Sequence, residues 1–291
     1  MLHGDFNQVA VDSLLNTGVK RVGVHLNPFQ GSVKDFVKYI NENENLINQL
    51  EKAGAIVDYH LHAVGSFMPK ITTENSSLFR CNEKGERVSD YNLCPSNQKS
   101  LELVEKGAEE LARALKQKSQ DYYFWTDDDM GGDVRCHCEK CKNLSFSAQN
   151  LEIYKAILKG IKKYNPNARL SYLIYGEEET CDKLPKDIFA LYAPFKRRHD
   201  LPLTAKENCF YKNRYLELIK TNENIQVLEY FLSYDYRGFC KNNSRVACDL
   251  QFYGENPPEL ITTFVVFPEK DYIQKYGDKG IADYFSIKSC N

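Results

Sequence analysis

The stretch VKRVGVHL (residues 19–26), followed by SVKDFVKYINENENLINQLEKAG (residues 32–54) and AIVDYHLHAV (residues 55–64), decides the fold class. The outer two pieces are rich in β-branched and aromatic residues, as buried strands are. The middle piece opens with the capping box Ser32-x-x-Asp35, carries apolar residues at helical spacing and ends at a glycine, so it predicts a helix. A strand, a helix and a second strand in this order predict a parallel βαβ unit.

The same alternation continues along the chain, with helical runs at residues 100–117 and 148–163. Six further strands are predicted, at residues 121–126, 169–175, 188–195, 225–232, 261–267 and 280–287. Eight strands alternating with helices in 291 residues predict a single α/β domain over residues 1–291, a (β/α)8 TIM-type barrel. A doubly wound nucleotide-binding sheet is disfavoured, because neither G-x-G-x-x-G nor G-x-x-x-x-G-K-[ST] occurs.

Charge and hydropathy set bounds on partners and location. The 38 basic and 40 acidic residues give a net charge of −2, which argues against nucleic acid or a membrane surface as partner. No apolar run has the length of a transmembrane helix, and the N-terminus MLHGDFNQVA lacks the regions of a signal peptide. We therefore expect a soluble protein, cytoplasmic as the sequence stands, or secreted or periplasmic if the sequence is a trimmed form. The oligomeric state stays open.

The acidic run in FWTDDDMGGDVRCHCEKC (residues 124–141) is the first candidate for chemistry. Asp127, Asp128 and Asp129 follow the third predicted strand, and the residues after the strands of a barrel build its active site. Three adjacent like charges raise the pKa of at least one carboxyl group, as a general acid requires. Trp125 offers a surface on which a sugar ring stacks. An Asp-rich turn is the alternative interpretation.

Polar and aromatic residues also lie near the ends of other predicted strands. The candidates for substrate binding, besides Trp125, are His62, Tyr175, Arg198, His199, Glu229 and Tyr230. Side chains alternate along a strand, so only some of this set can point into the barrel mouth. Carboxylates with aromatics, and no recognisable cofactor loop, favour acid/base hydrolysis of a neutral polar substrate such as a sugar.

The same stretch carries Cys136, Cys138 and Cys141 in the pattern C-x-C-x-x-C, three of the four ligands of a thiolate zinc site. The fourth ligand is Cys94, His137 or Cys81. A disulfide and reduced structural thiols are the alternatives. A metal ion or a disulfide would hold the loop that carries the aspartates. No cofactor is expected for catalysis itself, so zinc would be structural.

These segments together resemble a known family. HLHAVGSF, SLFRCNEKGERVSDYNLCPSNQKSLELV, DDDMGGDVRCHCEKC, SYLIYGE, RRHDLPL and VLEYF are similar, in this order, to domain-of-unknown-function family 4838 (DUF4838). That family includes glycoside hydrolase family 163, the endo-acting β-N-acetylglucosaminidases. The resemblance spans roughly residues 55–287, and the acidic pair followed by C-x-C-x-x-C and a helix is its most specific part.

The resemblance implies retaining, substrate-assisted hydrolysis of β-linked N-acetylglucosamine or a related acetamido sugar in a glycan, on a (β/α)8 barrel. The substrate's own acetamido oxygen attacks the anomeric carbon, Asp128 orients the acetamido group, and Asp129 protonates the leaving oxygen. Tyr175 is implied as a partner of the acetamido group, with His62 and His199 as sugar-binding candidates. The alternative register pairs Asp127 with Asp128.

The family's acidic pair follows a later strand than the third, which implies either a barrel incomplete at the N-terminus, without its first strand, or that residues 261–267 are not a barrel strand. Two other functions stay open: a carbohydrate-binding barrel without turnover, and a metal-dependent hydrolase that uses the aspartates with His60 and His62. The two histidines form an H-x-H on one strand, whose imidazoles are expected to point the same way.

Overall fold

A computed structural model describes residues 1–27, 29–128, 133–174, 183–233 and 243–266. The predicted strand at residues 280–287, and the candidate residues Asp129 and Tyr175, lie outside these ranges. Within the described ranges, no helix combines the length and apolar character needed to cross a membrane.

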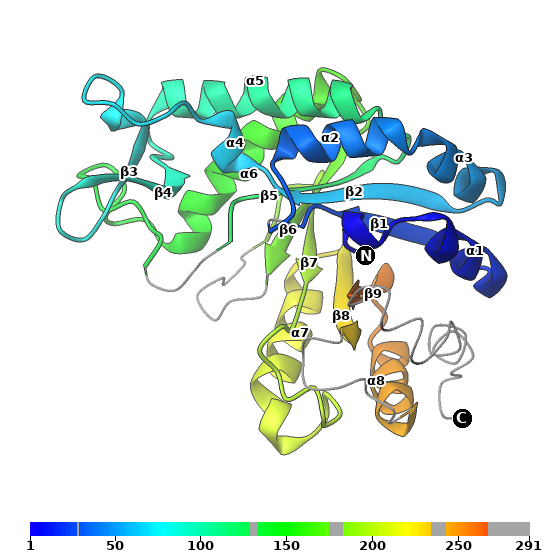
Figure 1. The fold of residues 1–291 in the computed structure, drawn as a ribbon. Coiled ribbons are helices and arrows are strands. Elements are labelled where there is room, and N and C mark those ends of the chain that lie inside the picture. The colour runs from blue at the N-terminus through cyan, green and yellow to red at the C-terminus, as the bar shows by residue number, and fades with distance from the viewer. Residues whose placement is uncertain (28, 129–132, 175–182, 234–242, 267–291) are drawn as a thin grey trace.

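Seven parallel strands form one curled sheet, the wall of a barrel that is open between its first and last described strands (Figure 1). The strands follow one another across the sheet in chain order, as in a (β/α)8 barrel. They are β1 (Arg21–His25), β2 (Ile56–His62), β5 (Asp121–Trp125), β6 (Arg169–Ile174), β7 (Ile188–Tyr192), β8 (Ile225–Ser233) and β9 (Leu260–Val266). The predicted barrel-type α/β fold and its first seven strands are confirmed.

Helices pack on the outer side of this sheet. They are α1 (Gln8–Thr17), α2 (Val33–Glu42), α3 (Glu44–Lys52), α4 (Val64–Phe67), α5 (Gln98–Leu115), α6 (Phe146–Lys162), α7 (Cys209–Thr221) and α8 (Asn243–Glu255). The long helices α5 and α6 lie side by side (Figure 1), and a Cβ on Gly160 of α6 would overlap the carbonyl oxygen of Glu105 in α5. Gly160 therefore permits the close approach of these two helices.

The predicted capping box is present, since Ser32 Oγ accepts from the Asp35 amide and the Asp35 carboxylate accepts from the Ser32 amide. The single helix predicted for residues 32–54 is instead two helices, α2 and α3. The break lies at Asn43, whose side-chain amide donates to the carbonyl oxygen of Tyr39 at 2.9 Å. An asparagine that bonds to nearby backbone in this way competes with the helical ladder.

The segment between β2 and α5, for which no helix or strand was predicted, contains a short antiparallel hairpin, β3 (Phe79–Cys81) and β4 (Arg87–Leu93). Three 3-10 turns, His3–Asp5, Ser76–Leu78 and Lys206–Asn208, complete the described elements. In Figure 1 the hairpin projects beside one end of α5, away from the barrel wall.

The inner face of the sheet is unusually polar at its amino-terminal end. Arg21 of β1 bridges Asp58 of β2 and Asp121 of β5, the latter at 3.0 Å, and Arg169 of β6 bonds Asp121 at 2.7 Å. Each charge has an opposite partner, which limits the cost of burying it. Gln226 of β8 donates to Asp121 at 3.1 Å and extends the network. This end of a barrel serves stability rather than chemistry.

Candidate active site

Two of the three predicted aspartates are described, and they stand at the carboxyl-terminal edge of the sheet. Asp127 and Asp128 follow β5 after Thr126, and neighbouring β2 ends at His62, whose register partner is Trp125. The ends of two adjacent parallel strands therefore bring the carboxylates and His62 together.

Asp127 lines a pocket of about 500 Å³. This volume lies within the range of about 300–1,000 Å³ typical of ligand sites. The other walls come from the segment after β2 and from the β3–β4 hairpin, through Gly65, Met68, Pro69, Lys70, Ile71, Phe79, Ser89 and Asn92. The hairpin, which the sequence did not predict, thus forms one wall of the pocket.

The position of Asp127 depends on Gly65, because a Cβ at residue 65 would overlap Asp127 Oδ2. Burial raises the pKa of the Asp127 carboxyl to about 6, against the opposing effects of His62 and of the hydrogen bond from the Gly65 amide. Asp127 is thus partly protonated near neutral pH, which is the state a general acid needs. A raised pKa within the acidic run was predicted from the repulsion of like charges; it is found at this residue, but burial is its main cause and the neighbouring Asp128 contributes least.

Asp128 is more exposed and is held by a histidine. Its Oδ1 lies 3.1 Å from His62 Nε2, and His62 Nδ1 lies 2.5 Å from the carbonyl oxygen of Thr126. The backbone contact fixes the imidazole ring, and the ring positions the carboxylate. The two carboxyl groups therefore have different surroundings although they are neighbours in sequence.

An aromatic row runs across the barrel from His62 to β8. His62 contacts His25 of β1, with ring centroids 6.1 Å apart, and His25 contacts Phe264 of β9 edge-on at 5.4 Å. Phe264 in turn lies 5.9 Å from Tyr230 of β8. Burial and the neighbouring His62 lower the pKa of His25 to about 3, so this ring is neutral at ordinary pH.

His25 and Phe264 were not among the residues predicted from the sequence, although each is a polar or aromatic residue near the end of a predicted strand, like the residues that were. His60 and His62 do point to the same face of β2, as the H-x-H spacing predicts: His60 stacks on Tyr123 at 4.1 Å, and His62 lies 5.2 Å from Trp125.

Two predicted sugar-binding residues, His199 and Tyr230, meet on the far side of the barrel mouth. Their rings pack edge to face at 5.6 Å, and Phe195 contacts Tyr230 at 5.2 Å. His199 Nε2 lies 2.7 Å from the carbonyl oxygen of Phe195. Both side chains are half-buried. The row of His25 and Phe264 separates them from the carboxylate pair.

Trp125 and Glu229 lie in the core, which corrects the prediction that they contact a sugar directly. Trp125 is 1% exposed, and its indole donates to Ser171 Oγ at 2.7 Å. Glu229 is fully buried and turns outward toward the helices, because alternation along β8 places it on the face opposite Gln226 and Leu228. Its carboxylate accepts from Arg197 at 2.9 Å and from Tyr253 of α8 at 2.7 Å.

Arg198 points outward. Its guanidinium pairs with Asp200 at 2.6 Å, and both side chains are well exposed. The structure thus brings together Asp127, Asp128 and His62 on one side of the mouth, and His199 with Tyr230 on the other, while Arg198 belongs to neither group.

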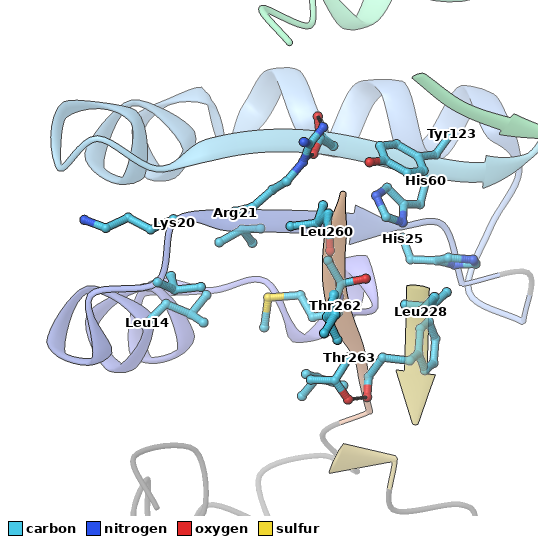
Figure 2. Close-up of a pocket in the computed structure, with 18 residues that line it drawn as sticks. Leu14, Lys20, Arg21, His25, His60, Tyr123, Leu228, Leu260, Thr262 and Thr263 are labelled. Atoms are coloured by element: carbon cyan, nitrogen blue, oxygen red, sulfur yellow. Dashed lines mark hydrogen bonds and ion pairs between the residues drawn. The ribbon is translucent and has the colours of Figure 1, made fainter. Parts of the chain in front are cut away.

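A second pocket, of about 240 Å³, lies in the wall between β1 and β9 (Figure 2). Figure 2 shows Arg21, His60 and Tyr123 on one side of it and Leu228, Thr262 and Thr263 on the other. Its lining is mainly apolar, and two of its charged groups, Arg21 and Asp58, are paired with each other. It lacks the carboxylate pair, so the carboxyl-terminal edge is the better candidate for catalysis.

Among the described residues, two groups have ligand atoms close enough to share a metal ion: the four cysteines Cys94, Cys136, Cys138 and Cys141, and the surface group Glu83, Asp133 and His137. Asp127 and Asp128 belong to neither group.

Solved structures share the overall fold of this chain. The chain superposes on an endoglucanase from Clostridium longisporum with a TM-score of 0.55 and 11% identity, covering 97% of this chain and 86% of that one. The chain has the barrel fold of glycoside hydrolases.

Two further structures have the same fold. A β-N-acetylhexosaminidase from Bacteroides fragilis aligns with a TM-score of 0.58 and 10% identity, over 100% of this chain and 66% of that one. An exo-β-N-acetylglucosaminidase from Vibrio harveyi aligns with a TM-score of 0.54 and 10% identity, over 95% and 50%. No protein-family model and no curated protein sequence matches this chain. At these identities the likeness is one of fold.

Proposed function

We propose that this protein is a glycoside hydrolase that cleaves β-linked N-acetylglucosamine, or a related acetamido sugar, by a retaining, substrate-assisted mechanism. The observation that carries the proposal is the placement of Asp127 and Asp128 side by side at the carboxyl-terminal edge, one in a pocket of about 500 Å³ and one held by His62. The fold shared with a β-N-acetylhexosaminidase and a β-N-acetylglucosaminidase supports the substrate class.

Adjacent carboxylates suit this mechanism better than the ordinary one. A glycosidase with two opposing carboxylates needs them on either side of the sugar, about 5–9.5 Å apart. Neighbouring residues after one strand approach the sugar from one side. In substrate-assisted hydrolysis the acetamido oxygen supplies the nucleophile on the other face, so no carboxylate is needed there.

The different surroundings of the two carboxylates suggest their roles. Asp127, with its raised pKa, is the general acid: it gives its proton to the glycosidic oxygen as the bond from that oxygen to the anomeric carbon breaks. The acetamido oxygen forms the new bond to the anomeric carbon. Asp128, held by His62, orients the acetamido group and offsets the positive charge that develops on it.

In the second step, water opens the cyclic intermediate at the anomeric carbon, and Asp127 takes the proton of that water. The product keeps the configuration of the substrate, because the anomeric carbon is inverted twice. This assignment uses the register of Asp127 with Asp128. It gives the acid role to the first residue of the pair, whereas the resemblance gives it to the second.

The test is hydrolysis of aryl N-acetylglucosaminides and of complex N-glycans by the wild type and by Asp127→Asn, Asp128→Asn and Asp129→Asn. A dinitrophenyl leaving group needs no proton, so Asp127→Asn should keep much of its turnover of that substrate and lose that of unactivated glycosides. Asp128→Asn should lose both. A thiazoline analogue of the intermediate should inhibit the wild type.

The outcomes separate the proposal from its alternatives. If Asp128→Asn and Asp129→Asn lose activity while Asp127→Asn stays active, the catalytic pair is Asp128 with Asp129 instead of Asp127 with Asp128. If glucosides, which lack the acetamido group, are hydrolysed as fast as the N-acetylglucosaminides, substrate assistance is excluded. If no glycoside is hydrolysed although acetamido sugars raise the melting temperature, the protein is a carbohydrate-binding barrel without turnover.

A further inference from the structure

Four cysteine sulfurs converge at one point beside the candidate active site. Cys94 follows β4 directly, and Cys136, Cys138 and Cys141 lie in the segment between β5 and α6. Their Sγ atoms all lie within 4.8 Å of one another, with Cys94 at 3.7 Å from Cys138 and at 3.8 Å from Cys141. The site therefore joins the hairpin to the loop that begins with the aspartates.

These distances do not fit disulfides and do fit a shared ion. A disulfide brings two sulfurs to about 2.05 Å, so the Cys94 sulfur is bonded to neither Cys138 nor Cys141. Four sulfurs at about 2.3 Å from a tetrahedral zinc ion are about 3.8 Å apart. The Cys94 sulfur already lies at this spacing from the sulfurs of Cys138 and Cys141. Cys94 is thus the fourth member of the set, among the three candidates that the sequence offered.

The backbone around the sulfurs is held by a buried glutamine of α6. The Gln149 side chain accepts from the Cys136 amide at 2.7 Å and donates to the carbonyl oxygens of Cys136 and Cys141 at 3.2 and 3.1 Å. A turn from Cys138, closed by its hydrogen bond from the Cys141 amide at 2.8 Å, brings these two cysteines together. The sulfur positions are therefore preorganised.

Donors and a cation surround the sulfurs as thiolates require. The Cys81 amide donates to Cys136 Sγ at 3.3 Å, and Ser96 Oγ lies 3.0 Å from Cys141 Sγ, close enough to donate to a thiolate by rotation of its hydroxyl. The Arg87 side chain lies close enough to Cys94 to interact with its sulfur. A zinc ion with four thiolates carries a net charge of −2, which these donors and the Arg87 guanidinium offset in part.

We propose that Cys94, Cys136, Cys138 and Cys141 bind one zinc ion as a structural site that ties the β3–β4 hairpin to the loop between β5 and α6. The same hairpin and loop supply Phe79 and Asp127 to the pocket of about 500 Å³. The zinc ion holds these two walls together and takes no part in the chemistry, because four protein ligands leave no open position for a substrate.

The test begins with the full chain, purified under reducing conditions, and elemental analysis for zinc and iron. We expect one zinc ion per chain after gel filtration, released when a mercurial reagent titrates the thiols. After exchange to Co²⁺, the protein should show the visible absorption bands of a tetrahedral cobalt thiolate. The zinc stoichiometry and the cobalt spectrum are measured without turnover. They therefore test the zinc site independently of the proposed glycosidase activity.

Four variants identify the ligands. Cys94→Ser and Cys141→Ser should lose the zinc ion and melt at a lower temperature than the wild type. Cys81→Ser, which removes a neighbouring sulfur outside the set, and Cys209→Ser, which removes an exposed thiol, should keep it. If the ligand variants do not fold, the cobalt spectrum of the wild type still decides the question.

Three results would overturn the proposal. Reduced wild type that stays free of zinc after incubation with zinc and gel filtration would show that the sulfurs are plain structural thiols. A mass two or four hydrogens lower than that of the reduced chain, in protein isolated without reductant, would show disulfides. Iron in place of zinc, with the colour of an iron–sulfur site, would assign a redox centre.

Discussion

Asp128 Oδ1 lies 3.1 Å from His62 Nε2, and the other ring nitrogen of His62 faces the carbonyl oxygen of Thr126 at 2.5 Å. A carbonyl oxygen only accepts hydrogen bonds, so Nδ1 carries a proton. Nε2 then faces the Asp128 carboxylate. His62 is thus a positioning residue for Asp128, and its orientation is set by backbone rather than by another titrating group.

Replacement of His62 by phenylalanine should lower kcat toward N-acetylglucosaminides, with a smaller effect on KM. The ring shape is kept, but Asp128 loses its partner, and we expect a loss of about 10- to 100-fold, as for partners that orient a reacting group. His137 offers a matched control, since its Nε2 lies at the same 3.1 Å from Asp133. Equal losses in His62→Phe and His137→Phe would contradict a specific role for His62.

The pH dependence of kcat/KM should reflect Asp127. A general acid must be protonated in the free enzyme, and burial raises the pKa of this carboxyl to about 6. Activity on unactivated glycosides should therefore fall as the pH rises through about 6, and by about tenfold for each further pH unit. The dinitrophenyl substrate should not show this alkaline limb. A profile for both substrates that is flat up to pH 8 would assign the acid elsewhere.

The same carboxyl should make Asp127→Asn more stable than the wild type at neutral pH. Its folded-state pKa lies above the ordinary value of 3.8, so the folded state binds the proton more tightly, and stability falls as the pH rises from about 4 to about 6. The full difference between the folded-state pKa and the ordinary pKa corresponds to about 3 kcal/mol of unfolding free energy. Because Asp127 is partly exposed, we expect Asp127→Asn to gain about 1–2 kcal/mol of unfolding free energy.

At about 2–4 °C per kcal/mol, the melting temperature of Asp127→Asn at pH 7.5 should exceed that of the wild type by several degrees. This difference in melting temperature should vanish below pH 4, where residue 127 is uncharged in the wild type as well as in the variant. Asp128→Asn is the control, because its carboxylate is half-exposed and gains no such stability. A lower melting temperature for Asp127→Asn than for Asp128→Asn at pH 7.5 would show that burial does not destabilise this charge.

Gly65→Ala should reduce activity without unfolding the protein. A methyl group at this position would overlap Asp127 Oδ2 and push the carboxylate out of its place in the pocket. A displacement of about 1 Å at a reacting group costs about 100-fold in rate. Gly254→Ala in α8 is the control, since a Cβ there has no heavy atom within 4 Å. Full activity in Gly65→Ala would mean that Asp127 acts from another position.

Arg197 and Arg198 should differ sharply in their contribution to stability although they are adjacent. The Arg197 side chain is fully buried between Glu229 at 2.9 Å and Asp249 at 2.7 Å. Arg197→Met leaves these two buried carboxylates without their cation, so it should lower the free energy of unfolding by about 3–5 kcal/mol. Arg198→Met removes an exposed pair with Asp200 and should cost less than about 1 kcal/mol. Denaturant unfolding of both variants measures the difference, and equal losses would contradict it.

The local sequence pattern was sufficient to predict most of the strands and helices of the barrel. The capping box at Ser32 and the β-rich runs have local causes, so the first seven strands and the start of α2 are where the sequence indicates. The β3–β4 hairpin was missed because β3 has only three residues and β4, RVSDYNL, is mostly polar. The break at Asn43 was missed because one asparagine within a periodic run does not by itself end a helix, whereas its side-chain hydrogen bond to the Tyr39 carbonyl oxygen competes with the helical ladder.

By itself, the sequence determined the parallel α/β order, the position of the aspartates after the third strand, and the three cysteines of the C-x-C-x-x-C pattern. Only the tertiary structure decided that Glu229 faces the helices while Tyr230 faces the barrel, that Asp127 is the less exposed of the two carboxyls, and that Cys94 is the fourth sulfur. The physical reason is distance along the chain. Periodicity and capping depend on residues within a few positions, whereas burial, pKa and the meeting of sulfurs 44 and 47 residues apart depend on which elements pack together.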